Sequence, residues 1–334
     1  MFFLIFVLIG VSILIFSILM TFSPERRAAS YISTPQQAKD LPRIIKEVGL
    51  DKPFYVQYFN WLRQITKGNF GYSLVASQSV WSAFWQYFPI TMELNLYAMP
   101  LVIFIGIWLG TIAGINRNKW IDHTTRVFAI VGWSLPTFLF ALLVLMMFYG
   151  YIPLFPPGEI SDKYSLIVRD PELFTRFTKM YTIDGILNGR LDITLDALRH
   201  LVLPVLTQVV VVIAILMRMM RSGMIEEISK DYIITARAKG ATNKILYYTH
   251  ARKNALIPVI TVAGELVAYS IQGSIAVEVV FNRQGIGSWL ANSATQLDVP
   301  VILAMSLFIG LVFVISNLII DILYGYIDPR IRYG

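Results

Sequence analysis

Residues able to perform covalent chemistry are few and scattered along this 334-residue chain. Cysteine is absent, which excludes thiol catalysis, disulfides and cysteine-ligated metals. The histidines His123, His200 and His250 stand on separate segments, and no H-E-x-x-H sequence suggests a zinc hydrolase. No G-x-x-x-x-G-K-[ST] sequence is present to cradle ATP phosphates. We therefore predict no catalytic residue, cofactor site or metal site in this chain.

Ionisable residues in or near the apolar segments are the next candidates, because such residues are costly in lipid. Glu93 is predicted in the first turn of its helix, where the helix dipole favours a carboxylate. Arg218 can extend its charged end to the membrane surface. Glu278 and Asp321 lie close to predicted helix ends. A structural role is the simpler interpretation for these four.

Glu265 differs because it lies seven residues beyond Pro258, which is about 10 Å along a helix. It is expected to face protein or a wet cavity. Two interpretations stay open: it lines a transport path, or it makes a hydrogen bond between helices. Gln272 and Asn317 are further candidates for the same two roles.

The composition is that of an integral membrane protein. Hydrophobic residues make up 56% of the chain and charged residues 15%, and mean hydropathy is +0.62. A soluble fold cannot hide that much apolar surface. The net charge of +7 fits the excess of Lys and Arg in cytoplasmic loops, so nucleic-acid binding is not expected.

Six apolar segments are long enough to cross a bilayer as helices, which predicts an all-α membrane protein of one domain over residues 1–334. The first segment has no charge and exceeds the apolar run of a signal peptide, so it is expected to be retained. The predicted spans are residues 1–22, 91–115, 127–151, 201–220, 255–280 and 300–324.

Loop charges predict the orientation. Residues 114–126 hold 3 Lys or Arg and residues 218–254 hold 8, about twice the density on the other side. The positive-inside rule therefore places both termini in the cytoplasm and the loops 23–88 and 152–200 outside.

Helical spacing predicts an amphipathic helix over 51–63. The aromatic residues of 80–88 indicate either a membrane-interface belt or a docking surface for a partner.

The loop between the fourth and fifth spans, within residues 226–258, has a specific local pattern. Asp231 is predicted to cap a short helix over 232–239, and Gly240 suits the left-handed position that ends it. Thr242 is predicted to cap a second helix, which Pro258 should bend or break. The product is a knob that can dock in a groove of a cytoplasmic protein. A merely basic loop is the alternative.

This loop resembles the coupling motif of ABC-importer permeases, in the version found in dipeptide and oligopeptide permeases. The sequence T-A-R-A-K-G over 235–240 is followed by R-K-N-A-L-I-P over 252–258. Many importers carry Glu at the position of Thr235, whereas the peptide branch commonly has Thr there. Further similar pieces follow in order over about 280 residues: 49–58, 68–73, 89–94, 134–138, 196–204, 278–287, 317–324 and 328–332.

The resemblance implies the type I ABC-importer permease class, a multi-pass protein of the cell membrane with a cytoplasmic coupling helix and helical insertions in its extracytoplasmic loops. It implies that the coupling loop contacts an ATPase through Tyr232, Thr235, Ala236, Arg237, Ala238, Lys239, Gly240, Ala241 and Pro258. Arg283, Gly285 and Gly287 are expected in an outer loop or gate, with residues 285–288 facing the delivered substrate or its binding protein.

The implied partners are a homologous second permease, two ATPase subunits, an extracytoplasmic binding protein and membrane lipid. ATP and Mg²⁺ would be bound by the ATPase subunits. The expected substrate is a di- or oligopeptide, with a nickel chelate or glutathione as the alternative within the family. An ion-gradient-driven secondary transporter and a membrane scaffold without transport are the rival classes; the first would predict mid-membrane charge relays.

Overall fold

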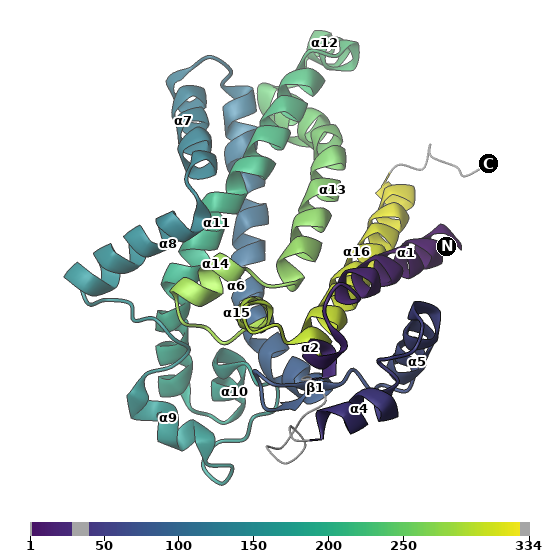
Figure 1. Cartoon of the computed structure of the whole chain (residues 1–334). Helices are drawn as coiled ribbons and strands as arrows, with labels where there is room; N and C mark the ends of the chain where they lie inside the picture. The colour runs from purple at the N-terminus through teal and green to yellow at the C-terminus, as the bar shows by residue number, and fades with distance from the viewer. Residues whose placement is uncertain (1, 29–39, 328–334) are drawn as a thin grey trace. The chain divides into compact units, whose positions relative to one another are not determined.

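The computed structural model describes residues 2–28 and 40–327, and the described chain is mainly helical (Figure 1). One short hairpin pairs Tyr72 with Ser79 and Ser73 with Gln78. In chain order the elements are α1 (Phe2–Leu19), α2 (Pro24–Ala28), α4 (Leu41–Val48), α5 (Phe54–Thr66), β1 (Tyr72–Ser73), β2 (Gln78–Ser79), α6 (Val80–Ile115), α7 (Trp120–Ser134), α8 (Thr137–Leu145), the π-helix η2 (Met146–Tyr151), α9 (Asp162–Arg169), α10 (Tyr181–Leu187), α11 (Leu191–Ile228), α12 (Asp231–Ala238), the π-helix η3 (Ile245–Ala251), α13 (Arg252–Ile271), α14 (Ile275–Val280), α15 (Ile286–Thr295) and α16 (Val299–Ile327).

Four helices in the described part of the chain are long and apolar enough to cross a membrane. They are α6, α11, η3 continued by α13, and α16. A fifth candidate is the pair formed by α7 and the segment Thr137–Tyr151, which is bent by 100°. The apolar α1 is shorter, at 18 residues. The count of six spans therefore stays a prediction, while the all-helical membrane fold is confirmed.

The third predicted span, 127–151, is not one continuous helix. Leu135 is extended, with ψ 126°, and Pro136 follows with ψ 131°. Proline disfavours the helical region for the residue before it and offers no backbone donor to the preceding turn. The chain therefore ends α7 at Ser134 and starts α8 at Thr137.

The fifth predicted span, 255–280, also ends early. α13 stops at Ile271, and Gly273 has a φ of +88° before α14 begins. A Cβ at Gly273 would lie 2.5 Å from the backbone N of Gly287, so the turn requires glycine. Conversely, Pro258 lies inside α13 and does not break it. The second and fourth spans extend beyond their predicted limits because helices α6 and α11 continue into more polar sequence.

The described chain falls into two compact units. The first lies within residues 1–91, 272–279 and 284–315, and the second within 92–271, 280–283 and 316–334. The prediction of one permease domain over the whole chain is not tested by this division. The predicted terminal motif at 328–332 lies outside the described residues.

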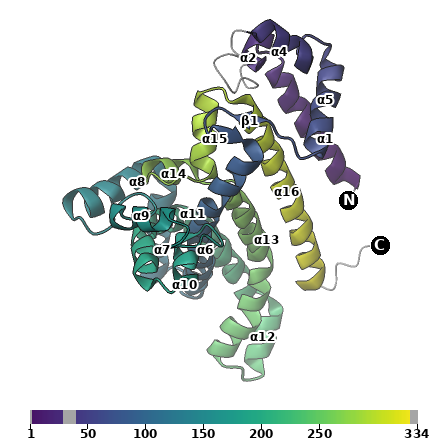
Figure 2. The same ribbon diagram turned by 90° about the horizontal axis from the view of Figure 1, so that it is seen from below.

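In the second unit, α11 is the central helix and packs against α7, α8, α10 and α13 (Figures 1 and 2). It also packs closely against α6 through Gly106, Gly110 and Gly114. A Cβ at Gly110 would lie 2.6 Å from Cβ of Met220 and 2.7 Å from the carbonyl O of Met217. Small residues four apart let two helix backbones approach in a membrane. The 152–200 loop forms helices α9 and α10, as predicted for a helical insertion.

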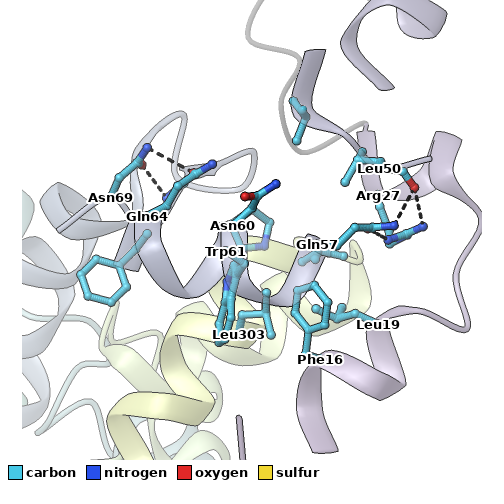
Figure 3. Close-up of a pocket in the computed structure, with 15 residues that line it drawn as sticks. Phe16, Leu19, Arg27, Leu50, Gln57, Asn60, Trp61, Gln64, Asn69 and Leu303 are labelled. Atoms are coloured by element: carbon cyan, nitrogen blue, oxygen red, sulfur yellow. Dashed lines mark hydrogen bonds between the residues drawn. The ribbon is translucent and has the colours of Figure 1, made fainter. Parts of the chain in front are cut away.

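In the first unit, α5 confirms the amphipathic helix predicted over 51–63. Its Tyr58 packs with Phe16 and Leu303, and the Tyr58 hydroxyl shares a 2.8 Å hydrogen bond with Ser12. Figure 3 shows the polar end of this packing, where Arg27 donates to Oε1 of Gln57 at 2.6 Å. Aromatic rings of 80–88 belong to the first turns of α6 and stack on one another.

Candidate functional site

Helix α12 and the turn after it form the candidate coupling element. The turn has the predicted geometry: Gly240 has a φ of +85°, and its N donates to the carbonyl of Arg237 at 3.0 Å. The N of Ala241 donates to the carbonyl of Ala236 at 3.1 Å. No atom lies within 4 Å of a Cβ built at Gly240. The need for glycine is therefore conformational and does not arise from crowding.

One detail of the predicted loop is corrected, which is the cap of α12. The N-cap of α12 is Lys230 in extended conformation, and Asp231 is the first helical residue without a side-chain capping bond. Asp231 still places its charge in the first turn, where the helix dipole favours it. After the turn, the carbonyl of Thr242 accepts from the N of Leu246 at 3.0 Å as the next helix begins.

The surface of α12 is available for contact. Only Ile233 of this helix is buried, at 1% exposure, and it fixes the helix to its own unit. The coupling candidates outside the buried core are half-buried Tyr232, Ala236 and Ala241 and exposed Thr235, Arg237, Ala238, Lys239, Gly240 and Pro258. The helix lies beyond the ends of α11 and α13 (Figures 1 and 2).

A polar cluster that sequence reasoning missed fixes α12 to its neighbours. The Tyr232 hydroxyl donates to Oε2 of Glu227 on α11 at 2.7 Å and accepts from Nδ2 of Asn254 on α13 at 3.0 Å. Lys230 Nζ lies 2.5 Å from Oε1 of the same carboxylate. Burial and the Glu227 carboxylate raise the pKa of the Tyr232 phenol above its ordinary value, so the phenol carries the proton that it donates to Glu227. Asn254 belongs to the segment 252–258 that resembles the coupling motif of the permeases, and that position was the one sequence signal for this cluster.

The predicted outer glycines form a cradle for a buried carboxylate. Glu278 Oε1 accepts from Thr91 Oγ1 at 2.8 Å, and Oε2 accepts from the N of Ser288 at 2.9 Å. Thr91 Oγ1 in turn accepts from the N of Ile286 at 2.8 Å. A Cβ at Gly285 would lie 2.5 Å from Glu278 Oε2 and 2.5 Å from Thr91 Oγ1. The segment is therefore shaped around the carboxylate.

Residues 285–288 are all buried in the chain, so the expectation that they face the delivered substrate or its binding protein stays a prediction. Their backbone is turned inward, and the N of Ser288 donates to Glu278, which offsets part of the cost of burying that carboxylate. Gly287 has the same constraint, since a Cβ there would lie 3.0 Å from Glu278 Oε2. Whether this cradle takes part in a gate stays a prediction.

Arg283 is also buried and forms an ion pair with Glu93. Its Nη2 lies 3.0 Å from Glu93 Oε2, and both side chains are 1% exposed. Glu93 Oε1 accepts from the N and Oγ1 of Thr182, at 2.8 and 2.9 Å. Glu93 is not in the first turn of its helix, because α6 begins at Val80. The carboxylate is instead stabilised by a full set of partners, which fits a structural role.

The candidates for a path or a helix interface do not form one cluster in the described contacts. Glu265 on α13 and Asn317 on α16 are exposed on the chain, while Gln272 is half-buried. A different polar chain was missed by sequence reasoning: Gln208 Nε2 donates to Asn95 Oδ1 at 2.8 Å, and Asn95 Nδ2 donates to the carbonyl of Ser270 at 2.8 Å. Uncharged amides inside apolar helices give little signal in composition.

Long apolar helices, helical insertions between them and a short exposed helix at one end define a multi-pass helical membrane protein. The chain belongs to the family described as binding-protein-dependent transport system inner membrane component, whose model matches residues 106–333. A second model, for the N-terminal membrane component of such systems, matches residues 1–95. The family has the type I ABC permease fold, so the chain is a membrane subunit of a transport system that has other subunits.

Similar proteins cover most of the chain. The probable D,D-dipeptide transport system permease protein DdpB of Escherichia coli (strain K12) is 38% identical over 291 residues, 87% of this chain and 84% of that protein. The dipeptide transport system permease protein DppB of Alkalihalophilus pseudofirmus is 36% identical over 332 residues, 98% of this chain and 96% of that protein. The di/tripeptide transport system permease protein DppB of Pseudomonas aeruginosa is 36% identical over 292 residues, 86% and 84% of the two chains.

Proposed function

We propose that this chain is the transmembrane permease subunit of an ATP-driven importer that moves di- or oligopeptides across the cell membrane by alternating access. The observation that carries the coupling role is α12, an exposed short helix ended by the left-handed Gly240 and held by the Tyr232 cluster. The peptide substrate rests on the similar permeases, whose names specify dipeptide or di/tripeptide transport.

The proposed partners follow from the family. A homologous second permease would complete the path, an extracytoplasmic binding protein would deliver peptide, and two ATPase subunits would bind ATP and Mg²⁺. α12 would dock in a groove of one ATPase subunit. Closure of the ATPase pair would then move α12 together with the ends of α11 and α13, because Tyr232 bonds to both helices. Nucleotide must bind one conformer better than the other to shift the equilibrium.

The density of Lys and Arg supports a cytoplasmic location for this coupling end, with both termini on the same side. Glu265 and Asn317 are exposed on the isolated chain, which suits either a path or contact with the second permease. Covalent chemistry is not expected of this subunit.

Co-purification and transport test the proposal together. The full chain extracted in mild detergent should bring with it two ATPase subunits and a second permease. Reconstituted with the binding protein, the assembly should take up labelled dipeptide only with ATP. Uptake that persists without ATP but collapses with the ion gradient would contradict the proposal and favour a secondary transporter. Competition by a nickel chelate or glutathione, with no competition by peptides, would move the substrate to the family alternative.

A further inference from the structure

Two adjoining cavities lie along the α7 and α11 helices of the second unit. The first, about 490 Å³, is lined by Arg117, Arg126 and Arg221 together with Ser222 and Ser229. It lies at the end of α11 from which the chain continues into α12.

The second cavity, about 350 Å³, is a groove between the same two helices, lined by apolar side chains together with Thr125 and the arginines Arg126, Arg218 and Arg221. Ala129, Ile130 and Met217 line it, and Arg126 and Arg221 line both cavities. Figures 1 and 2 both show α7 lying beside α11. A basic basin and an apolar groove thus share Arg126 and Arg221 in their linings.

The basin keeps a positive charge after its internal pairs are counted. Arg221 donates to both oxygens of the buried Asp122, at 2.5 and 2.9 Å. Arg126 lies farther from that carboxylate, with Nε 3.8 Å from Oδ1. Glu226, on the rim, lies 3.5 Å from Lys230 Nζ.

Arg117, Arg126, Arg218 and Arg221 line one or both cavities, and Asp122 and Glu226 are their acidic neighbours, which leaves a formal charge of +2. Arg117 and Arg218 are exposed on the chain. This charge stands at the mouth of an apolar groove, where a phosphate joined to a hydrocarbon chain would satisfy both parts.

We propose that this site holds an anionic phospholipid, with its phosphate at Arg117 and Arg126 and one acyl chain along Ile130 and Met217. Basic pockets between transmembrane helices bind acidic lipid headgroups, and guanidinium groups match phosphate geometry. A free phosphate ion would leave the apolar groove empty. A lipid without net charge would leave the positive charge of the arginines uncompensated. The bound lipid would brace α7 against α11.

Lipid titration of the full-length chain tests this. The chain is extracted in mild detergent, stripped of lipid and titrated with dioleoyl phosphatidylglycerol, dioleoyl phosphatidylcholine or glycerol phosphate, while its thermal unfolding midpoint is measured. The midpoint should rise with phosphatidylglycerol alone, because a ligand that binds only the folded state stabilises it. An equal rise with phosphatidylcholine would overturn the charge requirement, and an equal rise with glycerol phosphate would reduce the site to a phosphate site.

Charge variants locate the site. Arg117→Gln combined with Arg126→Gln should weaken phosphatidylglycerol binding roughly 25-fold, at about fivefold for each charge lost. Arg117→Lys with Arg126→Lys keeps the charge and should retain most of the binding, which separates lost binding from lost folding. Lys46→Gln with Lys67→Gln removes two exposed charges elsewhere and should leave binding unchanged. Equal phosphatidylglycerol binding by the glutamine variant and wild type would overturn the proposal, because the lipid would then bind without these two arginines.

Discussion

Gly240 illustrates how one residue can set the shape of a docking element. Its φ of +85° lies in a region that glycine adopts without strain and that strains a residue with a β-branched side chain. Space is not the constraint, since nothing lies within 4 Å of a Cβ there. A substitution therefore acts through backbone angle, and it should turn α12 without disturbing the core of the unit.

Gly240→Val should reach the membrane at normal abundance yet lose peptide-stimulated ATP hydrolysis and uptake. The strain of roughly 1–3 kcal/mol would be relieved by rotating α12 away from its groove. Gly240→Ala should fall between the variant and wild type. Uptake assays at matched abundance check this, and full uptake by Gly240→Val would show that the loop is a basic loop without a coupling role.

Tyr232→Phe tests the anchor beneath that helix. It removes the hydroxyl that donates to Glu227 at 2.7 Å and accepts from Asn254 at 3.0 Å. A hydrogen bond to a charged group contributes about 1.5–3 kcal/mol, so α12 should loosen and stimulated ATP hydrolysis should fall several-fold. Tyr248→Phe, at an exposed tyrosine in η3, is the matched control and should hydrolyse ATP normally. Equal activity of the two variants would remove the anchor role.

Gly285→Ala tests the cradle around Glu278. The new Cβ would lie 2.5 Å from both Glu278 Oε2 and Thr91 Oγ1, so these groups must move or the turn must open. Overpacking of this kind costs about 1–3 kcal/mol, which should lower the thermal unfolding midpoint measured in detergent. Gly10→Ala, where nothing lies within 4 Å, serves as the control. An unchanged midpoint for Gly285→Ala would mean that the cradle is not tightly packed.

At the scale of elements, the close approach of α6 and α11 depends on Gly106, Gly110 and Gly114. Each of them meets an α11 side chain, and successive contacts advance by one helical turn. Sequence reasoning passed over this spacing because glycines in an apolar helix carry no hydropathy signal. Their meaning depends on which helix lies opposite.

Gly110→Ala should separate these two helices. A Cβ would approach the Met217 carbonyl to 2.7 Å, and a backbone atom cannot move aside as a flexible side chain can. We expect a loss of about 1–3 kcal/mol, seen as a lower thermal midpoint and reduced recovery of folded protein. Gly150→Ala in η2, whose nearest neighbour is 3.9 Å away, should behave like wild type. Similar midpoints for both variants would contradict close packing at Gly110.

At the scale of the whole molecule, the charges of the loops predict how the chain is oriented across the membrane. A single cysteine at Lys244 should resist a membrane-impermeant thiol reagent in intact cells, and one at Lys52 should be labelled. The chain contains no native cysteine to confuse the result. Labelling after permeabilisation confirms that the Lys244→Cys thiol is reactive. The opposite pattern would reverse the orientation and place α12 outside.

The local features of this protein were readable in its sequence because their causes act over a few residues. Hydropathy marked the membrane helices, amphipathic spacing marked α5, and glycine chemistry marked the turn at Gly240. The break between α7 and α8 was also local, at Leu135 and Pro136, but a hydropathy window averages over one proline.

Tertiary structure alone decided where the buried polar groups go. Glu278 and Thr91 are 187 residues apart, and Arg283 and Glu93 are 190 apart. A carboxylate in an apolar segment must find donors, yet nothing in its neighbours along the chain specifies which ones. The same applies to Gly285. Its residue type alone indicates a loop, but the structure requires glycine there because a carboxylate oxygen of Glu278 and the hydroxyl of Thr91 occupy the space that a side chain would need.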